Sequence, residues 1–265
     1  MSSEKEVLKS LDLFAGCGGF TSAGERTRGK VVTAQFVEID PDAIAVLEDH
    51  WPEIPIHKDA KTFHCQKGEF DLITAGFPCT GTSTAGTRTG LEHPESALFR
   101  EALRIICECQ PKFSIIEQPV GIIDRGLRAI LGGLQLAGYQ SEVEIISASE
   151  LGAGHRRERL FIISYPYGQF RHIPRGWNEQ IRELVEKQRA NSQWLTVKRD
   201  RLCPDSGFSF QLVQGTNKRP LTVDSLTCPT RTPGRIRAKK LAGRTVTPSQ
   251  AAIAIERVLY LNSLL

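Results

Sequence analysis

The feature that most constrains the fold is a regular alternation of short apolar runs with amphipathic stretches through the first 165 residues. The apolar runs have the length of strands, and the amphipathic stretches have the spacing of helices. Strands that alternate with helices predict a parallel, doubly wound α/β sheet, which binds ligands at the carboxyl ends of its strands. We expect strands at residues 10–14, 31–37, 71–75, 113–117, 142–146 and 160–164.

Helix signals lie between these runs. Asp40 can cap a helix and Pro41 fits a first turn, so we expect a helix from there to about residue 50. Gly138 is typical of the residue that follows a helix. We expect further helices at residues 96–108, 125–137, 179–189 and 248–261, the last of them returning to the first domain.

The charge composition of the chain changes after Tyr165. Residues 166–240 hold 15 Lys/Arg and 6 Asp/Glu, a net of +9, whereas the remainder holds 19 and 24, a net of −5. A basic block beside an acidic one indicates that one part meets a polyanion, although a solvated basic surface has the same composition. We expect a large domain of residues 1–165 and 241–265, and a small, mostly irregular or β domain of residues 166–240.

Composition excludes several classes of protein. No stretch approaches the roughly 18 apolar residues of a membrane helix, and the N-terminus lacks the apolar region of a secretory signal. The seven cysteines are scattered without a C-x-x-C pair, so we expect neither a metal site nor a disulfide framework. A reducing, cytoplasmic location fits this pattern.

A glycine-rich turn at residues 14–19 follows the first predicted strand. Thr21 stands where the dinucleotide fingerprint has its last glycine, so the turn is not typical of pyrophosphate binding. Glu38 ends the second strand, where a carboxylate can bind ribose hydroxyls, and Asp59 is placed to read an exocyclic amine. Together these residues predict a nucleoside cofactor.

A thiol stands in the polar loop that follows the strand at residues 71–75. Cys79 lies between Pro78 and a Thr/Gly/Ser run that includes Ser83. A lone cysteine is usually a small core residue. Catalytic residues collect at the carboxyl ends of strands, however, and thiolate is a strong nucleophile near neutral pH. We therefore interpret Cys79 as a nucleophile.

Three more charged residues are candidates for chemistry. Glu117 ends an apolar strand, where burial would raise its pKa and suit it to donate a proton; a helix cap or an ion pair is the alternative role. Arg157 and Arg159 alternate before the last strand, so both face one side and could grip a base edge or phosphates. A solvated charge run is the alternative for the arginines.

The order of these residues is similar to that of the C5-cytosine DNA methyltransferase family. The resemblance covers residues 10–165 and 235–262, and the motifs stand in the family's order. They are the cofactor loop (residues 14–19), the nucleophile loop (Pro78, Cys79), the Glu of the ENV motif (Glu117), the paired arginines of the Q-x-R-x-R motif (Arg157, Arg159) and the last motif (residues 243–248).

The resemblance implies a Rossmann-like methyltransferase sheet, S-adenosylmethionine as the cofactor and double-stranded DNA as the partner. It assigns the large domain to catalysis and the small domain to target recognition. Cys79 would add to C6 of a cytosine flipped out of the duplex, so that C5 can take the methyl group. Glu117 would stabilise the intermediate at N3, and Arg157 or Arg159 would hold O2.

The resemblance also implies binding residues. Those for the cofactor are Phe14, Ala15, Gly16, Cys17, Gly18, Gly19, Glu38, Ile39, Asp59, Ala60, Phe77, Pro78, Leu98, Arg244, Thr245 and Val246, and those for DNA are Ser83, Arg156, Lys198, Arg199, Lys218, Arg219 and Arg231.

Five positions depart from the family's motifs: Thr80 replaces a Gln, Gln118 an Asn, Pro119 a Val, His155 a Gln and Arg244 an Asn. A cation near a sulfonium is electrostatically unfavourable. Arg244 therefore raises the hypothesis that the cofactor is carboxy-S-adenosylmethionine and that the group placed on cytosine is carboxymethyl. The simpler alternative is that Arg244 turns to a DNA phosphate or to the cofactor's own carboxylate.

Two other readings stay open, an RNA cytosine methyltransferase and an inactive DNA-binding homologue. We expect a monomer in the cytoplasm of a bacterial or phage-infected cell, without contact to a membrane. The target sequence and any restriction endonuclease partner stay open.

Overall fold

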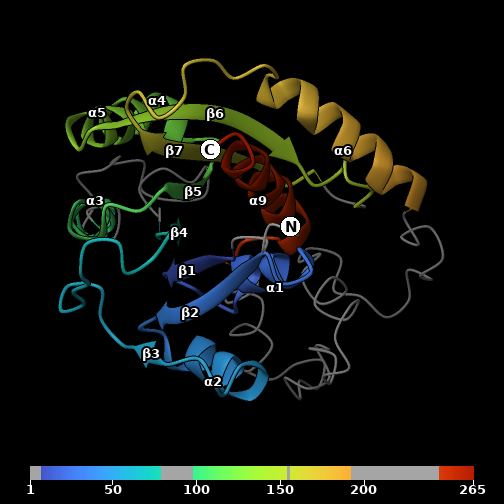
Figure 1. Cartoon of the computed structure of the whole chain (residues 1–265). Helices are drawn as coiled ribbons and strands as arrows, with labels where there is room; N and C mark the ends of the chain where they lie inside the picture. The colour runs from blue at the N-terminus through green and yellow to red at the C-terminus, as the bar shows by residue number, and fades with distance from the viewer. Residues whose placement is uncertain (1–6, 79–97, 154–155, 192–244) are drawn as a thin grey trace, which may run out of the picture.

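The computed structural model describes residues 7–78, 98–153, 156–191 and 245–265. These residues form a seven-stranded sheet in the order β3-β2-β1-β4-β5-β7-β6, with helices on both faces (Figure 1). The strands are β1 (Leu8–Leu13), β2 (Val31–Val37), β3 (Ile56–His57), β4 (Leu72–Ala75), β5 (Phe113–Pro119), β6 (Tyr139–Ser147) and β7 (Glu158–Pro166). The helices are α1 (Gly19–Glu25), α2 (Pro41–His50), α3 (Leu98–Cys109), α4 (Ile122–Arg125), α5 (Leu127–Leu136), α6 (Trp177–Asn191) and α9 (Pro248–Asn262).

The doubly wound α/β sheet that the sequence predicts is confirmed, but the prediction that the sheet is wholly parallel was wrong. β1 to β5 pair in parallel, whereas β7 runs antiparallel to both β5 and β6. Only residues 148–157 connect β6 to β7. This connection is too short for the crossover that a parallel neighbour needs, so the two strands form a hairpin.

The order of the strands places the switch point of the sheet between β1 and β4. The chain runs outward from β1 to β2 and β3, and then returns to β4 on the other side of β1. The connections after β1 and β4 therefore leave the sheet in opposite directions, which is where doubly wound sheets bind ligands. The candidate site residues follow the carboxyl ends of these strands and their neighbours.

Alternating strand residues divide the core between the two faces of the sheet. α3 and α5 pack on one face against Ile73 and Ile116, and α1, α6 and α9 pack on the other face against Leu72 and Ile115. α2 covers Phe36 of β2 in a smaller cluster. The alternation of faces explains why the strands are apolar at successive positions.

The ends of α2 and α5 test the helix boundaries that the sequence predicts. The predicted helix at 41–50 is confirmed, and its cap is Asp40, whose carboxylate accepts a hydrogen bond from the backbone N–H of Asp42 at 2.9 Å. The helix predicted at 125–137 is confirmed as α5 (Leu127–Leu136), and Gly126, with a φ of −164°, separates it from the short helix α4 that ends at Arg125. Gly138 follows α5 in the left-handed region, with a φ of +89°, as its position predicts.

α9 brings the C-terminal described residues back to the start of the chain. It packs against α1, and α6 lies beside it over the same face of the sheet (Figure 1). Among the described residues, no helix combines the length and the apolar character that a bilayer crossing requires.

Candidate functional site

The glycine turn between β1 and α1 is packed more tightly than a ligand alone would require. A Cβ atom on Gly18 would lie 2.4 Å from the Trp51 ring, and one on Gly19 would lie 2.1 Å from the backbone carbonyl of Val246. Gly18 also has a φ of +74°, which disfavours other residues. Neighbouring protein segments therefore demand glycine at both positions, whether or not a ligand is bound.

The residue that begins this turn has an unusual backbone. Phe14 has a φ of +55°, in the left-handed region that residues with a side chain rarely adopt. Its ring meets the edge of Phe77, with the centroids 6.3 Å apart. Such conformations persist where the surrounding structure imposes them, and they cluster at binding and catalytic sites. The two phenyl rings thus join the ends of β1 and β4.

Glu38 lies at the end of β2 and reaches the glycine turn. One carboxylate oxygen accepts a hydrogen bond from the N–H of Gly16 at 2.7 Å, and the other accepts from Ile39 and Asp40 at 2.9 and 2.8 Å. Burial raises the pKa of Glu38, although these three hydrogen bonds oppose the rise. The apolar side chain of Ile39 is 68% exposed beside it. A buried carboxylate beside an exposed apolar side chain suits a nucleoside, with its hydroxyls on one and its base on the other.

Cys17 lies within the turn but is unsuited to act as a nucleophile. Its side chain is 2% exposed. Burial raises the pKa of its thiol to about 12, although a hydrogen bond with Thr245 opposes the rise. The thiol therefore stays protonated at neutral pH and packs as a small apolar group.

The segment after β3 carries two more of the predicted cofactor residues. Asp59 is half-buried, and its carboxylate accepts a hydrogen bond from the N–H of Lys61 at 2.9 Å. Ala60 is buried beside it. This turn lies at the carboxyl edge of the sheet, beyond β2.

Glu117 of β5 forms a charged group with Arg159 of β7 and with Arg157 just before that strand; Glu117 is buried and the two arginines are half-buried. In the antiparallel pairing Glu117 lies opposite Phe161, so Arg159 is on the same face two residues along. Arg159 Nε is 2.8 Å from Glu117 Oε1, and the two side chains are 19% and 8% exposed. Burial raises the pKa of Glu117, against the effect of Arg159 and then Arg157. Burial likewise lowers the pKa of Arg157 to about 10, with a contribution from Arg159.

The residues before α9 connect this charged group to the glycine turn. Arg157 Nη2 donates a hydrogen bond to the backbone carbonyl of Thr245 at 2.6 Å. A Cβ on Gly76 would lie 3.0 Å from Val246 Cγ2 and 3.6 Å from Glu117 Oε2. Gly76 follows β4 in the segment that leads to Cys79. The structure thus brings together the ends of β1, β4, β5 and β7 around Thr245 and Val246.

The remaining predicted residues lie at the borders of the described ranges or outside them. Pro78 and Leu98 flank residues 79–97 and are half-buried, and Arg156 is exposed. The roles of residues outside the described ranges stay predictions: Cys79, Thr80, Ser83, His155, Lys198, Arg199, Lys218, Arg219, Arg231 and Arg244 lie there.

Sequence reasoning missed three residues that shape the site. Asp12 is 1% exposed within the apolar strand β1, and a carboxyl group between two leucines was the signal for it. Gln118 donates from Nε2 to the carbonyl of Phe77 at 3.1 Å, just before the nucleophile loop. Arg104 of α3 binds the turn that holds Asp59 and Ala60; its place on an amphipathic helix gave no such signal. Within the described ranges, no group of three His, Cys, Asp or Glu side chains is arranged to hold a metal ion.

Comparison with known proteins gives the family. Residues 8–203 match the family model described as C-5 cytosine-specific DNA methylase. The chain is 36% identical over 161 residues to the Type II methyltransferase M.CviJI of Paramecium bursaria Chlorella virus IL3A, which covers 59% of this chain and 42% of that protein. It is 27% identical over 241 residues to M.DsaV of Dactylococcopsis salina, covering 84% and 68%. The chain thus spans less than half of the first relative and about two thirds of the second.

Solved structures share the fold. The Dnmt2 methyltransferase of S. pombe superposes with a TM-score of 0.55 at 20% identity, over 73% of this chain and 59% of that one. An E. coli protein described as a "putative DNA modification methyltransferase encoded within prophage" superposes with a TM-score of 0.59 at 18% identity, over 97% and 98%. At these identities the likeness concerns the fold alone.

Proposed function

The chain belongs to the family of C-5 cytosine-specific DNA methylases, and from this premise we propose that it transfers a methyl group from S-adenosylmethionine to carbon 5 of cytosine in double-stranded DNA. The observation that carries the proposal is the group of the buried Glu117 with the half-buried Arg157 and Arg159, beside the segment that leads to Cys79. A buried acid with two cations beside it suits a polar heterocycle that must be held and protonated.

The cofactor would lie across the ends of β1 and β2. Glu38 is placed for the ribose hydroxyls, Ile39 for the face of the adenine and Asp59 for its exocyclic amine. Thr245 and Val246 pack against the glycine turn at Gly16 and Gly19. When bound, the cofactor would supply a methyl group on a sulfonium, and the neutral thioether formed by the transfer is a good leaving group.

The protein's own residues make the cytosine reactive. Attack of the Cys79 thiolate on C6 forms a carbon–sulfur bond and moves an electron pair toward N3. Glu117 stabilises that charge by hydrogen bonding or by giving N3 a proton, which burial of the carboxyl group favours. C5 is then nucleophilic and takes the methyl group. A base removes the C5 proton, the C5–H electron pair re-forms the C5–C6 double bond as the thiolate leaves, and any proton given to N3 returns to Glu117.

Access to C6 requires the base to leave the stack. Attack comes perpendicular to the ring, and stacking in the duplex blocks that direction. Arg157 and Arg159 would hold O2 of the flipped cytosine, and Arg157 is fixed for this by its hydrogen bond to Thr245.

Transfer of labelled methyl groups to duplex DNA and to tRNA tests the proposal. Duplex DNA should be labelled by the wild type and not by Cys79→Ala, which should still bind cofactor. DNA with 5-fluorocytosine at the target should trap a covalent complex only with the wild type, because fluorine cannot leave as a proton does. Labelling of tRNA alone, or an active Cys79→Ala variant, would overturn the proposal. Nucleoside mass spectrometry with carboxy-S-adenosylmethionine in parallel tests the carboxymethyl hypothesis raised by Arg244.

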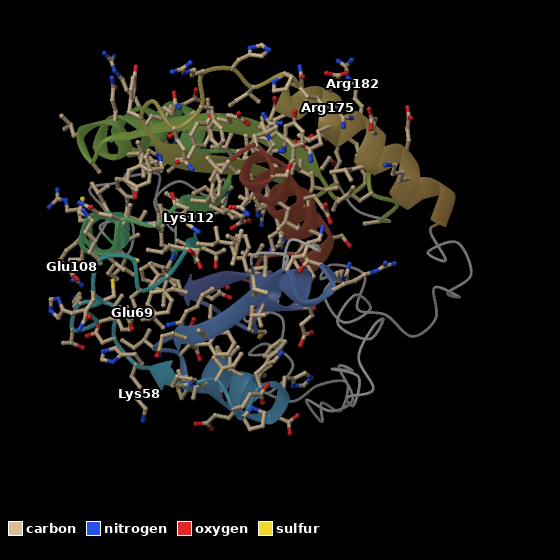
Figure 2. All side chains as sticks on the ribbon, in the orientation of Figure 1. Lys58, Glu69, Glu108, Lys112, Arg175 and Arg182 are labelled. Atoms are coloured by element: carbon tan, nitrogen blue, oxygen red, sulfur yellow. The ribbon has the colours of Figure 1, made fainter. Side chains whose placement is uncertain are left out.

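We propose that the basic residues between 166 and 240 supply most of the DNA contacts. In the described part of this segment, Arg175 precedes α6 and Arg182 lies within it. Both are on the opposite side of the molecule from Lys58 (Figure 2). If such residues neutralise phosphates, log K should fall linearly with log [salt], with a slope of roughly −0.9 per contact. Binding measured by fluorescence anisotropy across a salt series checks this, and a nearly flat dependence would reject the assignment.

A further inference from the structure

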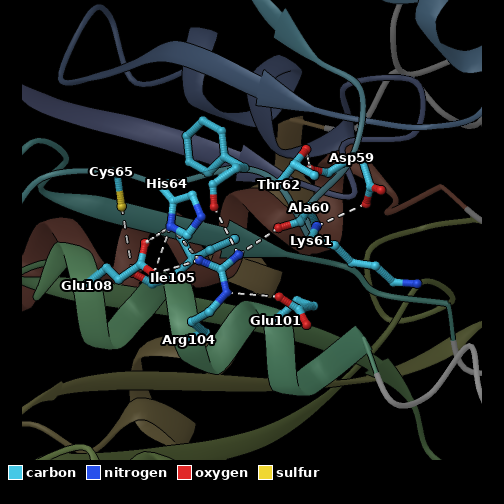
Figure 3. A network of polar contacts seen from close by, with 11 residues as sticks. Asp59, Ala60, Lys61, Thr62, His64, Cys65, Glu101, Arg104, Ile105 and Glu108 are labelled. Atoms are coloured by element: carbon cyan, nitrogen blue, oxygen red, sulfur yellow. Dashed lines mark hydrogen bonds and ion pairs between the residues drawn. The ribbon is translucent and has the colours of Figure 1, made fainter.

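One arginine holds the turn after β3 against α3 (Figure 3). Arg104 Nη2 donates hydrogen bonds to the backbone carbonyls of Ala60 and Phe63, at 2.8 and 2.9 Å. The other side of the guanidinium pairs with its own helix, Nε with Glu101 at 2.9 Å and Nη1 with Glu108 at 2.7 Å. The side chain therefore bridges two elements that are not adjacent in the sequence.

The geometry of these contacts suits a guanidinium and not an ammonium group. A planar fork presents its donors in fixed directions, so that two carboxylates can orient one side while the other side meets two carbonyls. Glu101 and Glu108 lie three residues before and four residues after Arg104, on one face of α3. They hold the fork in place before any ligand arrives.

The turn that Arg104 binds is braced in itself. Asp59 accepts from the N–H of Lys61, and His57 Nε2 lies 2.9 Å from Thr62 Oγ1. Phe63 is buried in the core below. The two hydrogen bonds from Arg104, with the pairing of His64 and Glu108 at 3.1 Å, hold the backbone of the turn against α3.

We propose that Arg104 is a positioning residue for the cofactor's adenine. It holds the backbone of Ala60 so that the neighbouring Asp59 carboxylate faces the exocyclic amine. This inference rests on the proposed function, because it takes the cofactor to be an adenosyl compound. Binding groups need support of this kind, since a small displacement of a hydrogen-bonding group removes most of its selectivity.

The test is the ability to distinguish two ligands that differ only at the reading position. S-adenosylhomocysteine carries an amine on the base, and S-inosylhomocysteine carries a carbonyl there. Titration calorimetry should show that the wild type prefers the adenosyl compound. In Arg104→Met we expect this preference to shrink roughly tenfold, the value of one well-placed hydrogen bond. Arg104→Lys should keep part of the preference, and kcat at saturating cofactor should change little in either variant.

Matched variants separate positioning from general damage. Arg100 is exposed on the same helix one turn earlier, and Arg100→Met should leave the preference unchanged. Should Arg104→Met fail to fold, Glu101→Gln serves as the second variant, because Glu101 contacts Arg104 Nε and removal of its charge should reduce the preference by a smaller factor. Loss of affinity for both ligands by the same factor would overturn the inference.

The outcomes also separate this inference from the proposed function. A wild type that binds neither ligand and transfers no methyl group rejects the proposed function. A wild type that methylates DNA, with an Arg104→Met variant that still prefers the adenosyl compound as strongly, rejects only the role of Arg104.

Discussion

At the scale of single residues, Asp12 shows how a polar network underlies the glycine turn. Its carboxylate accepts hydrogen bonds from the hydroxyls of Thr74 at 2.8 Å and Thr21 at 3.2 Å. The Thr21 hydroxyl also lies 3.0 Å from that of Thr33. Burial raises the pKa of Asp12 from 3.8 to about 7, although the two threonines oppose the rise. These hydroxyls stabilise the carboxyl group without restoring the solvation that it loses.

This shift predicts a pH dependence of stability. Because the pKa of Asp12 is raised in the folded state, its contribution is fully present below pH 4 and is lost as the pH rises to about 7. Asp12→Asn lacks the titrating group. The free energy of unfolding of the wild type, relative to Asp12→Asn, should therefore fall by roughly 3–4 kcal/mol between pH 4 and pH 8. Urea denaturation of both proteins across this range measures the difference, and a difference independent of pH would show that Asp12 does not titrate as described.

At the scale of elements, α1 begins against the segment that precedes α9. A Cβ on Gly19 would meet the Val246 carbonyl at 2.1 Å. Gly19→Ala should therefore displace residues 245–246 and weaken S-adenosylmethionine binding by at least tenfold, with a lower melting temperature. Gly132→Ala in α5 is the matched control, since a Cβ there meets nothing within 4 Å; it should be neutral or stabilise the helix by up to about 1 kcal/mol. Calorimetric titration and thermal unfolding check both variants, and unaltered binding by Gly19→Ala would contradict the packing described.

Elements also show what the sequence could predict. Apolar runs located every strand except β3, which has only two residues and so carries no periodicity. The sequence did not predict that β7 runs antiparallel to its neighbours, because an apolar run has the same pattern in a parallel and in an antiparallel strand. The pairing of Glu117 with Arg159 follows from that antiparallel register; an ion pair was the alternative role predicted for Glu117, but its partner was not predicted. Arg104 was missed because its carbonyl partners are set by tertiary packing.

At the scale of the whole molecule, a buried arginine joins α9, β6 and α6. Arg257 is 1% exposed and pairs with Glu142 through Nε at 2.7 Å and Nη2 at 2.8 Å. Its Nη1 donates to the carbonyl of Arg175 and to Gln180 Oε1, at 2.9 and 3.2 Å. The segment that leads from the sheet into the basic residues is thereby tied to the catalytic sheet at α6.

Removal of this arginine should loosen α6 first. Arg257→Met removes the donor to Glu142 Oε2 and to the Arg175 carbonyl, while Tyr165 still donates to Glu142 Oε1, and the lost ion pair costs roughly 3 kcal/mol in the free energy of unfolding. Amides of α6 should then exchange hydrogen faster than those of α3, which lies on the other face. Arg182→Met, on the exposed side of α6, should change neither quantity. Hydrogen exchange by mass spectrometry together with urea denaturation measures both effects, and uniform acceleration in α3 and α6 would reject a local tie.

The contact between Gly19 and Val246 has a consequence for biosynthesis. The ribosome adds roughly 5–20 residues per second, so Val246 is made some ten to forty-five seconds after Gly19. During that interval the nascent chain has its glycine turn but not the residues that cover it. The glycine turn therefore reaches its final packing only after residues 245–262 have emerged from the ribosome and α9 has packed against α1, and under the proposed function tight cofactor binding would begin only then.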